Sequence, residues 1–195
     1  RLKVDSLHGL LLHRSSDMHG AQGPALYAAM QRLKSEGLVK KIGVSVYSPA
    51  ELDASAGKFD FDLIQAPLNL VDHRLQASGW LRRLKVQGCE VHIRSAFLQG
   101  LLLMPQAAIP AKFGQWSGIW NAWHHWLQQH DADAVGTCLA YPLSIAHIDR
   151  VVVGANDLEQ LQQIMAAAGR PIEQPLPDLG CNDENLLNPA KWSSL

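Results

Sequence analysis

Short blocks of consecutive apolar residues alternate along the chain with longer segments in which apolar positions recur every three or four residues. In the first block, residues 7–13, Leu10, Leu11 and Leu12 stand side by side, and glycine and serine close in at both ends. Such uninterrupted runs are typical of strands buried on both faces of a parallel sheet. The longer segments have the period of helices that cover a sheet. Repeated five times, this order predicts an α/β fold, either a barrel or a doubly wound sheet.

The boundaries of the predicted elements follow from turn and cap residues. The predicted strands are residues 7–13, 42–46, 61–66, 89–96 and 150–153, and the predicted helices are residues 23–37, 49–57, 76–87, 113–130, 131–141 and 156–168. Ser48 before Pro49, and Asn156 three residues before Glu159, are typical helix starts. Beyond Pro171, prolines and turns without a period predict an irregular tail that wraps the surface.

Composition narrows the class of protein. The 195 residues are 47% hydrophobic and 18% charged, with a formal net charge of −1, as expected for one globular domain. No basic cluster suits nucleic acid, and no apolar run reaches the roughly 18 residues of a membrane span. Cys89, Cys138 and Cys181 are too widely spaced for a metal or redox motif, so we expect reduced thiols. We therefore expect a cytoplasmic protein that binds neither nucleic acid nor membrane.

The first residues resemble the end of a helix that runs into a strand. The chain opens on Arg1, without a methionine, so we expect that upstream sequence has been removed or that the chain is incomplete. The glycine patterns of dinucleotide-binding sheets and of phosphate-binding loops are missing from the sequence, which favours a barrel. A barrel of eight units needs about 250 residues, so five units would form only part of one.

All five predicted strands end in polar residues or glycine. Ligands of parallel α/β folds lie beyond the carboxyl ends of the strands, so these residues are candidates for one site. A helix start after the last strand offers N–H groups to a phosphate. The alternative for each residue alone is an ordinary turn or cap. The candidates are His13, Ser45, Gln65, the pair Arg94–Ser95, and Gly154–Ala155–Asn156.

The segment 113–130 carries bulky apolar residues at helical spacing: Trp116, Trp120, Trp123 and Leu127. Core packing is the favoured interpretation of this stripe. The alternative is that Trp116 and Trp120 line a substrate pocket within the long insertion Leu101–Gln129. Histidines at positions 124, 125 and 130 suggest a metal site, but adjacent histidines face different ways on a helix and no carboxylate completes the set. The sequence therefore predicts no metal site.

Five segments, in order along the chain, resemble the aldo/keto reductase family of (β/α)8 barrels, which move a hydride between NADP(H) and a carbonyl or alcohol. LKVDSLHGLLLHR resembles strand four, GLVKKIGVS strand five, DLIQAPLNL strand six, VHIRSAFLQGLLL strand seven, and RVVVGANDLEQL the last strand with its phosphate-binding helix. The likeness spans about Leu2 to Ala168. It implies an α/β fold that is a partial TIM (β/α)8 barrel: strands 4–8 with their helices in residues 1–170, the first three βα units absent, and a tail at 171–195.

The resemblance implies roles for the strand-end residues nearest the reaction. His13 matches the catalytic histidine, which hydrogen-bonds and polarises the substrate carbonyl. Ser45 and Gln65 match residues that hold the nicotinamide carboxamide. Arg94, followed by Ser95, stands where many members place an aromatic ring that stacks on the nicotinamide, and a guanidinium plane can also stack.

The rest of the cofactor site is implied in the same way. Gly154, Asn156 and Gln160 match positions around the adenosine 2′-phosphate and ribose, so NADP(H) is the expected cofactor and NAD(H) the alternative. Val46 replaces an asparagine that usually follows IGVS, which removes one hydrogen bond to the carboxamide.

The family's catalytic tyrosine, aspartate and lysine lie on the first three barrel units, which these five segments do not include. We therefore expect an oxidoreductase of small carbonyl or alcohol substrates whose 195-residue chain is inactive alone. Val46 and Arg94 favour one alternative, a non-catalytic NADP-binding regulatory module of the same fold. Another alternative is a different TIM-barrel enzyme with a phosphate site after its last strand.

Overall fold

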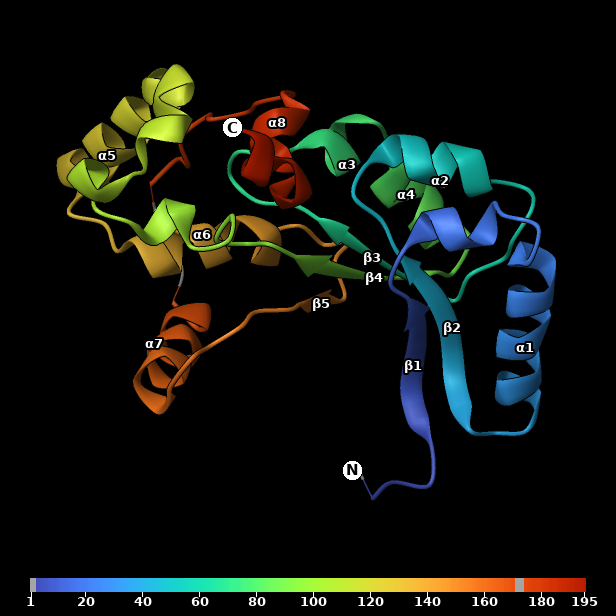
Figure 1. Ribbon diagram of the computed structural model, residues 1–195. Helices are drawn as coiled ribbons and strands as arrows, with labels where there is room; N and C mark the ends of the chain where they lie inside the picture. The colour runs from blue at the N-terminus through green and yellow to red at the C-terminus, as the bar shows by residue number, and fades with distance from the viewer. Residues whose placement is uncertain (1–2, 171–173) are drawn as a thin grey trace. The chain divides into compact units, whose positions relative to one another are not determined.

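A five-stranded sheet whose strands follow chain order forms the framework of the protein (Figure 1). The computed structural model describes residues 3–170 and 174–195. Within the sheet, the first strand pairs in parallel with the second and the second with the third. The strands are β1 Leu7–Leu12, β2 Val39–Ser45, β3 Leu63–Pro67, β4 Glu90–Arg94 and β5 Arg150–Val151.

Helices connect the strands, and their order confirms the predicted α/β class. The helices of the described residues are α1 Gly23–Ser35, α2 Pro49–Ser55, α3 Arg74–Ala77, α4 Trp80–Val86, α5 Ser117–His130, α6 Ala134–Leu143, α7 Leu158–Ala168 and α8 Glu184–Leu187. Short 3-10 helices occupy Ser15–Met18, Leu101–Leu103, Gln106–Ala108, Ala111–Trp116 and Pro189–Ser194.

Several predicted helices differ from the structure at their boundaries. The predicted helix 113–130 begins as α5 only at Ser117, because residues 111–116 form a 3-10 helix. The predicted helix 76–87 is two helices, α3 and α4, because Gly79 between them has a left-handed φ of 77° that ends one helix before the next begins. The predicted stop at Pro142 is also wrong. Proline lies in the last turn of α6, which begins after its cap Asp133 and runs to Leu143.

The last strand is shorter than predicted. Regular pairing ends at Val151 rather than at residue 153. The backbone N–H of Val152 still donates to the carbonyl of Ile93, at 2.7 Å, so the chain leaves the sheet gradually.

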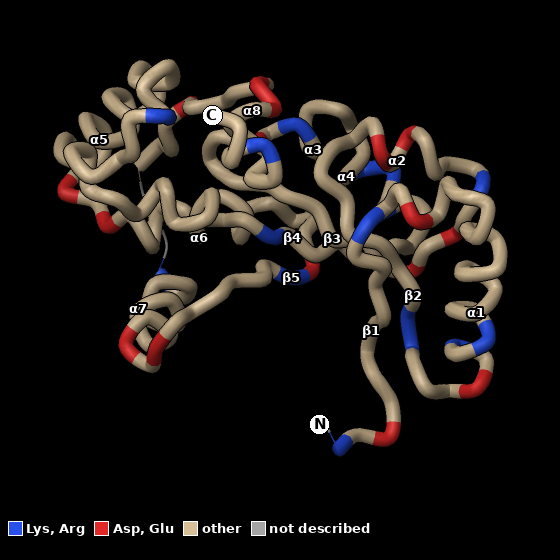
Figure 2. The backbone as a smooth tube through the Cα atoms, viewed as in Figure 1, with Lys and Arg blue, Asp and Glu red and all other residues tan. Residues whose placement is uncertain are grey.

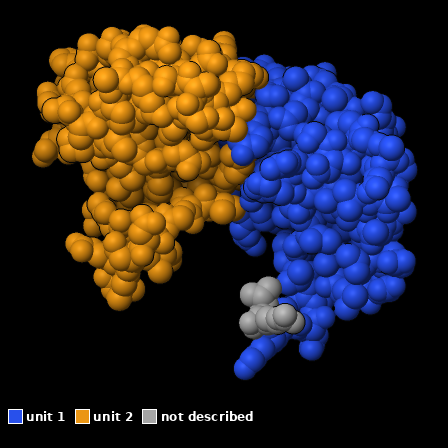
Figure 3. Space-filling view, in the orientation of Figure 1, with its two compact units in different colours: residues 1–67, 75–92, 147–150 blue, residues 68–74, 93–146, 151–195 orange. Residues whose placement is uncertain are grey.

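The chain is composed of two compact units, which we describe separately (Figure 3). Unit 1 comprises residues 1–67, 75–92 and 147–150, and unit 2 comprises residues 68–74, 93–146 and 151–195. In unit 1, α1 packs on the first two strands through Met30, Val39 and Ile42. The division between the two units falls within β4 and between the two residues of β5.

The core of unit 2 is built around the tryptophan stripe. Trp120 and Trp123 are buried, and their indole N–H groups donate to the carbonyls of Phe113 and Leu102, each at 2.9 Å. These bonds satisfy the polar atom that each ring takes out of water. Core packing, the favoured interpretation of the stripe, is confirmed. Helices α5 and α6 contain no Lys, Arg, Asp or Glu (Figure 2).

The tail is more ordered than the sequence indicates. Pro171 lies outside the described residues, but α8 and a 3-10 helix follow it, and Leu179, Leu186 and Leu187 are buried in the tryptophan core. The sequence did not predict the burial of these leucines, because they do not repeat at a helical period and lie among prolines and turns. The tail is therefore part of the core of unit 2 rather than a surface wrap.

All three cysteines are free, and Cys89 and Cys138 are buried. Among the described residues, none of the helices is long and apolar enough to cross a membrane.

The backbones of β2 and β3 approach each other closely at Gly43. A Cβ atom on Gly43 would lie 1.9 Å from the carbonyl oxygen of Leu63, far inside van der Waals contact. Only glycine leaves room for the two strands at this register, in which Gly43 is paired with Leu63.

We expect Gly43→Ala to lower the free energy of unfolding by at least about 2 kcal/mol, because backbone atoms must move to admit the methyl group. The matched control is Gly20→Ala, at an exposed turn of unit 1 where a Cβ meets nothing within 4 Å. Urea unfolding followed by circular dichroism measures both. Equal midpoints for the two variants would contradict the close approach.

Candidate functional site

In unit 1 the structure brings two of the predicted cofactor residues together. Ser45, buried, is the last residue of β2, and Gln65, half-buried, lies near the end of β3. The register pairs these two residues, and the Ser45 hydroxyl donates to Gln65 Oε1 at 3.5 Å. A hydroxyl and an amide side by side offer both donors and acceptors to a planar polar group such as a carboxamide.

His13 lies where the sequence predicts it, immediately after β1. The last pair in the register of β1 and β2 joins Leu12 to Val44, so His13 follows one step later, at the level of Ser45. Its side chain is exposed. An exposed imidazole at the carboxyl edge of a parallel sheet is open to a ligand there.

In unit 2 a cavity of about 640 Å³ gathers four of the predicted residues: Ser95, Gly154, Asn156 and Gln160. Phe97 and Gln163, which the sequence did not single out, also line it. The described residues that line this cavity include no charged side chain. Its size is within the usual range for small-molecule sites, roughly 300–1,000 Å³.

Arg94 does not line this cavity, but it contacts a residue that does. Arg94 Nη1 donates to the Ser95 hydroxyl at 3.2 Å. Ser95 has a left-handed φ of 63°, which turns the chain sharply after β4. The bond and the turn together fix the direction of the Ser95 side chain.

The start of α7 corrects one sequence prediction. Asp157, not Asn156, is the N-cap: its backbone is extended and its carboxylate accepts from the Gln160 N–H at 2.8 Å. Gln160 Oε1 in turn accepts from the Asn156 N–H at 2.9 Å. Sequence reasoning missed this reciprocal arrangement, although an acidic residue three positions before a glutamine is the pattern of a capping box.

This arrangement leaves a defined set of donors for an anion. The Asn156 and Gln160 N–H groups are already bonded, whereas Leu158 and Glu159, in the first turn of α7, have no carbonyl one turn earlier to bond. The Gln160 side-chain amide can donate as well. The start of α7 can therefore bind a phosphate through neutral donors and the helix dipole.

The sequence of the chain identifies its family. The sequence model described as "Aldo/keto reductase family" matches residues 1–174. The chain belongs to the aldo/keto reductase family. The resemblance to this family is thereby confirmed. No match was found among curated protein sequences.

Solved structures with a similar fold are also aldo-keto reductases. The holo form of the aldo-keto reductase AKR11C1 from Bacillus halodurans is 19% identical with a TM-score of 0.67, over 88% of this chain and 58% of that one. The apo form of the same protein is also 19% identical, with a TM-score of 0.66 over 88% of this chain and 59% of that one. The thermostable aldo-keto reductase Tm1743 in complex with the inhibitor epalrestat is 18% identical, with a TM-score of 0.59 over 89% of this chain and 58% of that one. The chain thus spans under three fifths of the length of these structures, and at this identity the likeness shows the fold alone.

Replacing Asp157 by alanine should lower the stability of the α7 region by about 1 kcal/mol, because the Gln160 N–H loses its acceptor. Asn156→Ala is the matched control, since its side chain is not the cap. Hydrogen exchange of the α7 amides in both variants measures the difference. Faster exchange in Asn156→Ala than in Asp157→Ala would support Asn156 as the cap, as predicted from the sequence.

Proposed function

We propose that the chain provides the cofactor site and one catalytic residue of an aldo/keto reductase that transfers a hydride between NADP(H) and a small carbonyl or alcohol. The observation that carries this proposal is the unit 2 cavity. Four residues chosen from the sequence line it: Ser95 after β4, and Gly154, Asn156 and Gln160 around the start of α7. Family membership supports the same chemistry.

The cavity and its donors fit the adenosine end of such a cofactor. Gln160 and the first turn of α7 would hold the phosphate, and Ser95 and Gly154 would lie along the sugar. Because the described lining residues are uncharged, a 2′-phosphate would gain hydrogen bonds but no ion pair. We therefore propose NADP(H) as the cofactor, with a preference over NAD(H) of no more than about tenfold.

By resemblance to the family, three strand-end residues would act on the nicotinamide and the substrate. Ser45 and Gln65 would orient the carboxamide, and His13 would donate a hydrogen bond to the substrate oxygen and stabilise the negative charge that develops on it. The cofactor, when bound, supplies the hydride. Proton transfer to that oxygen falls to the family's tyrosine with its aspartate and lysine, which no segment of this chain resembles.

We therefore propose that the 195-residue chain binds cofactor without turning over substrate, and that turnover needs the remaining barrel units. The second candidate function is a non-catalytic NADP-binding regulatory module. It is favoured by Val46, a buried apolar residue where the family usually has an asparagine, and by Arg94 in place of an aromatic. A protein that carries the tyrosine, aspartate and lysine, binds NADPH tightly and still reduces no aldehyde would favour this second function.

Gln160→Ala should raise the Kd for NADPH about tenfold, because the amide that faces the phosphate is removed. The control is Gln162→Ala, on the same helix but not part of the cavity lining, and it should change the Kd less than twofold. Titration of NADPH fluorescence measures both variants, and a parallel NADH titration gives the cofactor preference. An equal increase of the Kd for NADPH in both variants would argue against this cavity as the phosphate site.

A further inference from the structure

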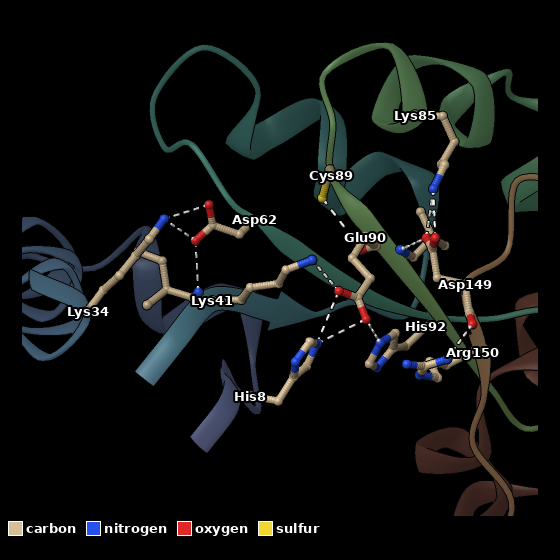
Figure 4. Close-up of polar contacts among 12 residues, drawn as sticks. His8, Lys34, Lys41, Asp62, Lys85, Cys89, Glu90, His92, Asp149 and Arg150 are labelled. Carbon is tan, nitrogen blue, oxygen red and sulfur yellow. Dashed lines mark hydrogen bonds and ion pairs between the residues drawn. The ribbon is translucent and has the colours of Figure 1, made fainter. Parts of the chain in front are cut away.

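Two histidines and a glutamate converge in unit 1 on a place that the proposed cofactor site does not use (Figure 4). His8 comes from β1, and Glu90 and His92 come from β4. His8 Nε2 lies 3.1 Å from one carboxylate oxygen of Glu90, and His92 Nε2 lies 2.6 Å from the other. One nitrogen or oxygen atom from each side chain lies within 4.8 Å of the other two.

The backbone explains why these side chains meet. Glu90 and His92 are two residues apart on a strand, so they project from the same face of β4. Glu90 has a side chain only 9% exposed and His92 one only 14% exposed, so both are held by their surroundings. His8 is 55% exposed and approaches the pair from solvent. Two ligands are therefore fixed in advance, and the third can move to close around an ion.

We propose that His8, Glu90 and His92 form a binding site for a divalent transition-metal ion of the Zn²⁺ type. Two imidazole nitrogens and one carboxylate are a ligand set that zinc uses, with a fourth position left for water. Ligand atoms in a tetrahedral zinc site are roughly 3.3 Å apart, given the usual bond lengths. His8 Nε2 and His92 Nε2 lie 3.2 and 2.6 Å from the same oxygen, Oε1 of Glu90, and the three ligand atoms all lie within 4.8 Å of one another, so small side-chain movements would bring them to this spacing.

Lys41 is the competitor of the metal in this site. Its ammonium group forms an ion pair with Glu90 Oε2 and so occupies the carboxylate without an ion. A third of the Lys41 side chain is exposed, so the flexible stem can carry the ammonium into solvent when the metal arrives. Removal of this charge should strengthen metal binding, which a set of unrelated surface histidines would not show.

The test uses the 195-residue chain, freed of metal by dialysis against EDTA and titrated with Zn²⁺ by calorimetry. We expect one saturable site. His8→Ala, which removes a mostly exposed side chain and leaves the buried pair intact, should weaken binding at least tenfold, and His92→Ala should do the same. The matched control is His147→Ala, an exposed histidine of unit 1 outside the cluster, which should leave the affinity unchanged.

In contrast to the histidine variants, Lys41→Met should bind Zn²⁺ about tenfold more tightly than the wild-type chain. Co²⁺ added to the same variants gives a second readout, because the visible absorption of a four-coordinate Co²⁺ site should appear with the wild-type chain and fade in His8→Ala. The proposal is overturned if the wild-type chain shows no saturable Zn²⁺ binding, if His8→Ala binds as tightly as wild type, or if Lys41→Met binds more weakly. None of these outcomes depends on NADPH, so failure here leaves the proposed function standing.

Discussion

The contact between the backbones of β2 and β3 at Gly43 determines the geometry of unit 1. Because no side chain separates Gly43 from Leu63, the two strands keep one register, and that register places Ser45 beside Gln65 two residues further on. A slip of one residue would turn one of these polar groups to the opposite face of the sheet. The absence of a side chain at Gly43 thus permits the register that places the two predicted carboxamide-binding residues side by side.

Lysine–carboxylate pairs lie just before β3 and β5, at the ends of these strands opposite to the predicted ligand-binding edge (Figure 4). Asp62 accepts from the backbone N–H of Ile42 and pairs with Lys34, and Asp149 accepts from the N–H of Val91 and pairs with Lys85. For each carboxyl group, burial acts to raise the pKa, and the lysine and backbone hydrogen bonds lower it overall. Each aspartate therefore satisfies a backbone donor where the sheet begins, while the opposite edge keeps its polar residues available for ligands.

The sequence predicted the strands and the strand-end residues well because both depend on local patterns. Consecutive leucines mark β1, and His13 follows it as expected. Ser45 and four of the residues that line the unit 2 cavity were singled out by their position after strands and by family resemblance. Features that depend on a particular backbone angle were missed, such as the break between α3 and α4 at Gly79. Contacts between distant segments were missed too: His8 and Glu90 are 82 residues apart, and no local pattern relates them.

The uneven distribution of tryptophan gives the two units different optical signatures. Five of the six tryptophans belong to unit 2, and Trp80 alone belongs to unit 1, where its indole N–H donates to Asp53 at 3.1 Å. Trp123 and Trp126 are stacked with an interplanar angle of 8°, close enough to share excitation. Intrinsic fluorescence of the whole chain therefore reports mainly on unit 2. A chain in which only Trp80 remained would emit from unit 1 alone, so the protein already contains a spectroscopic label for each half.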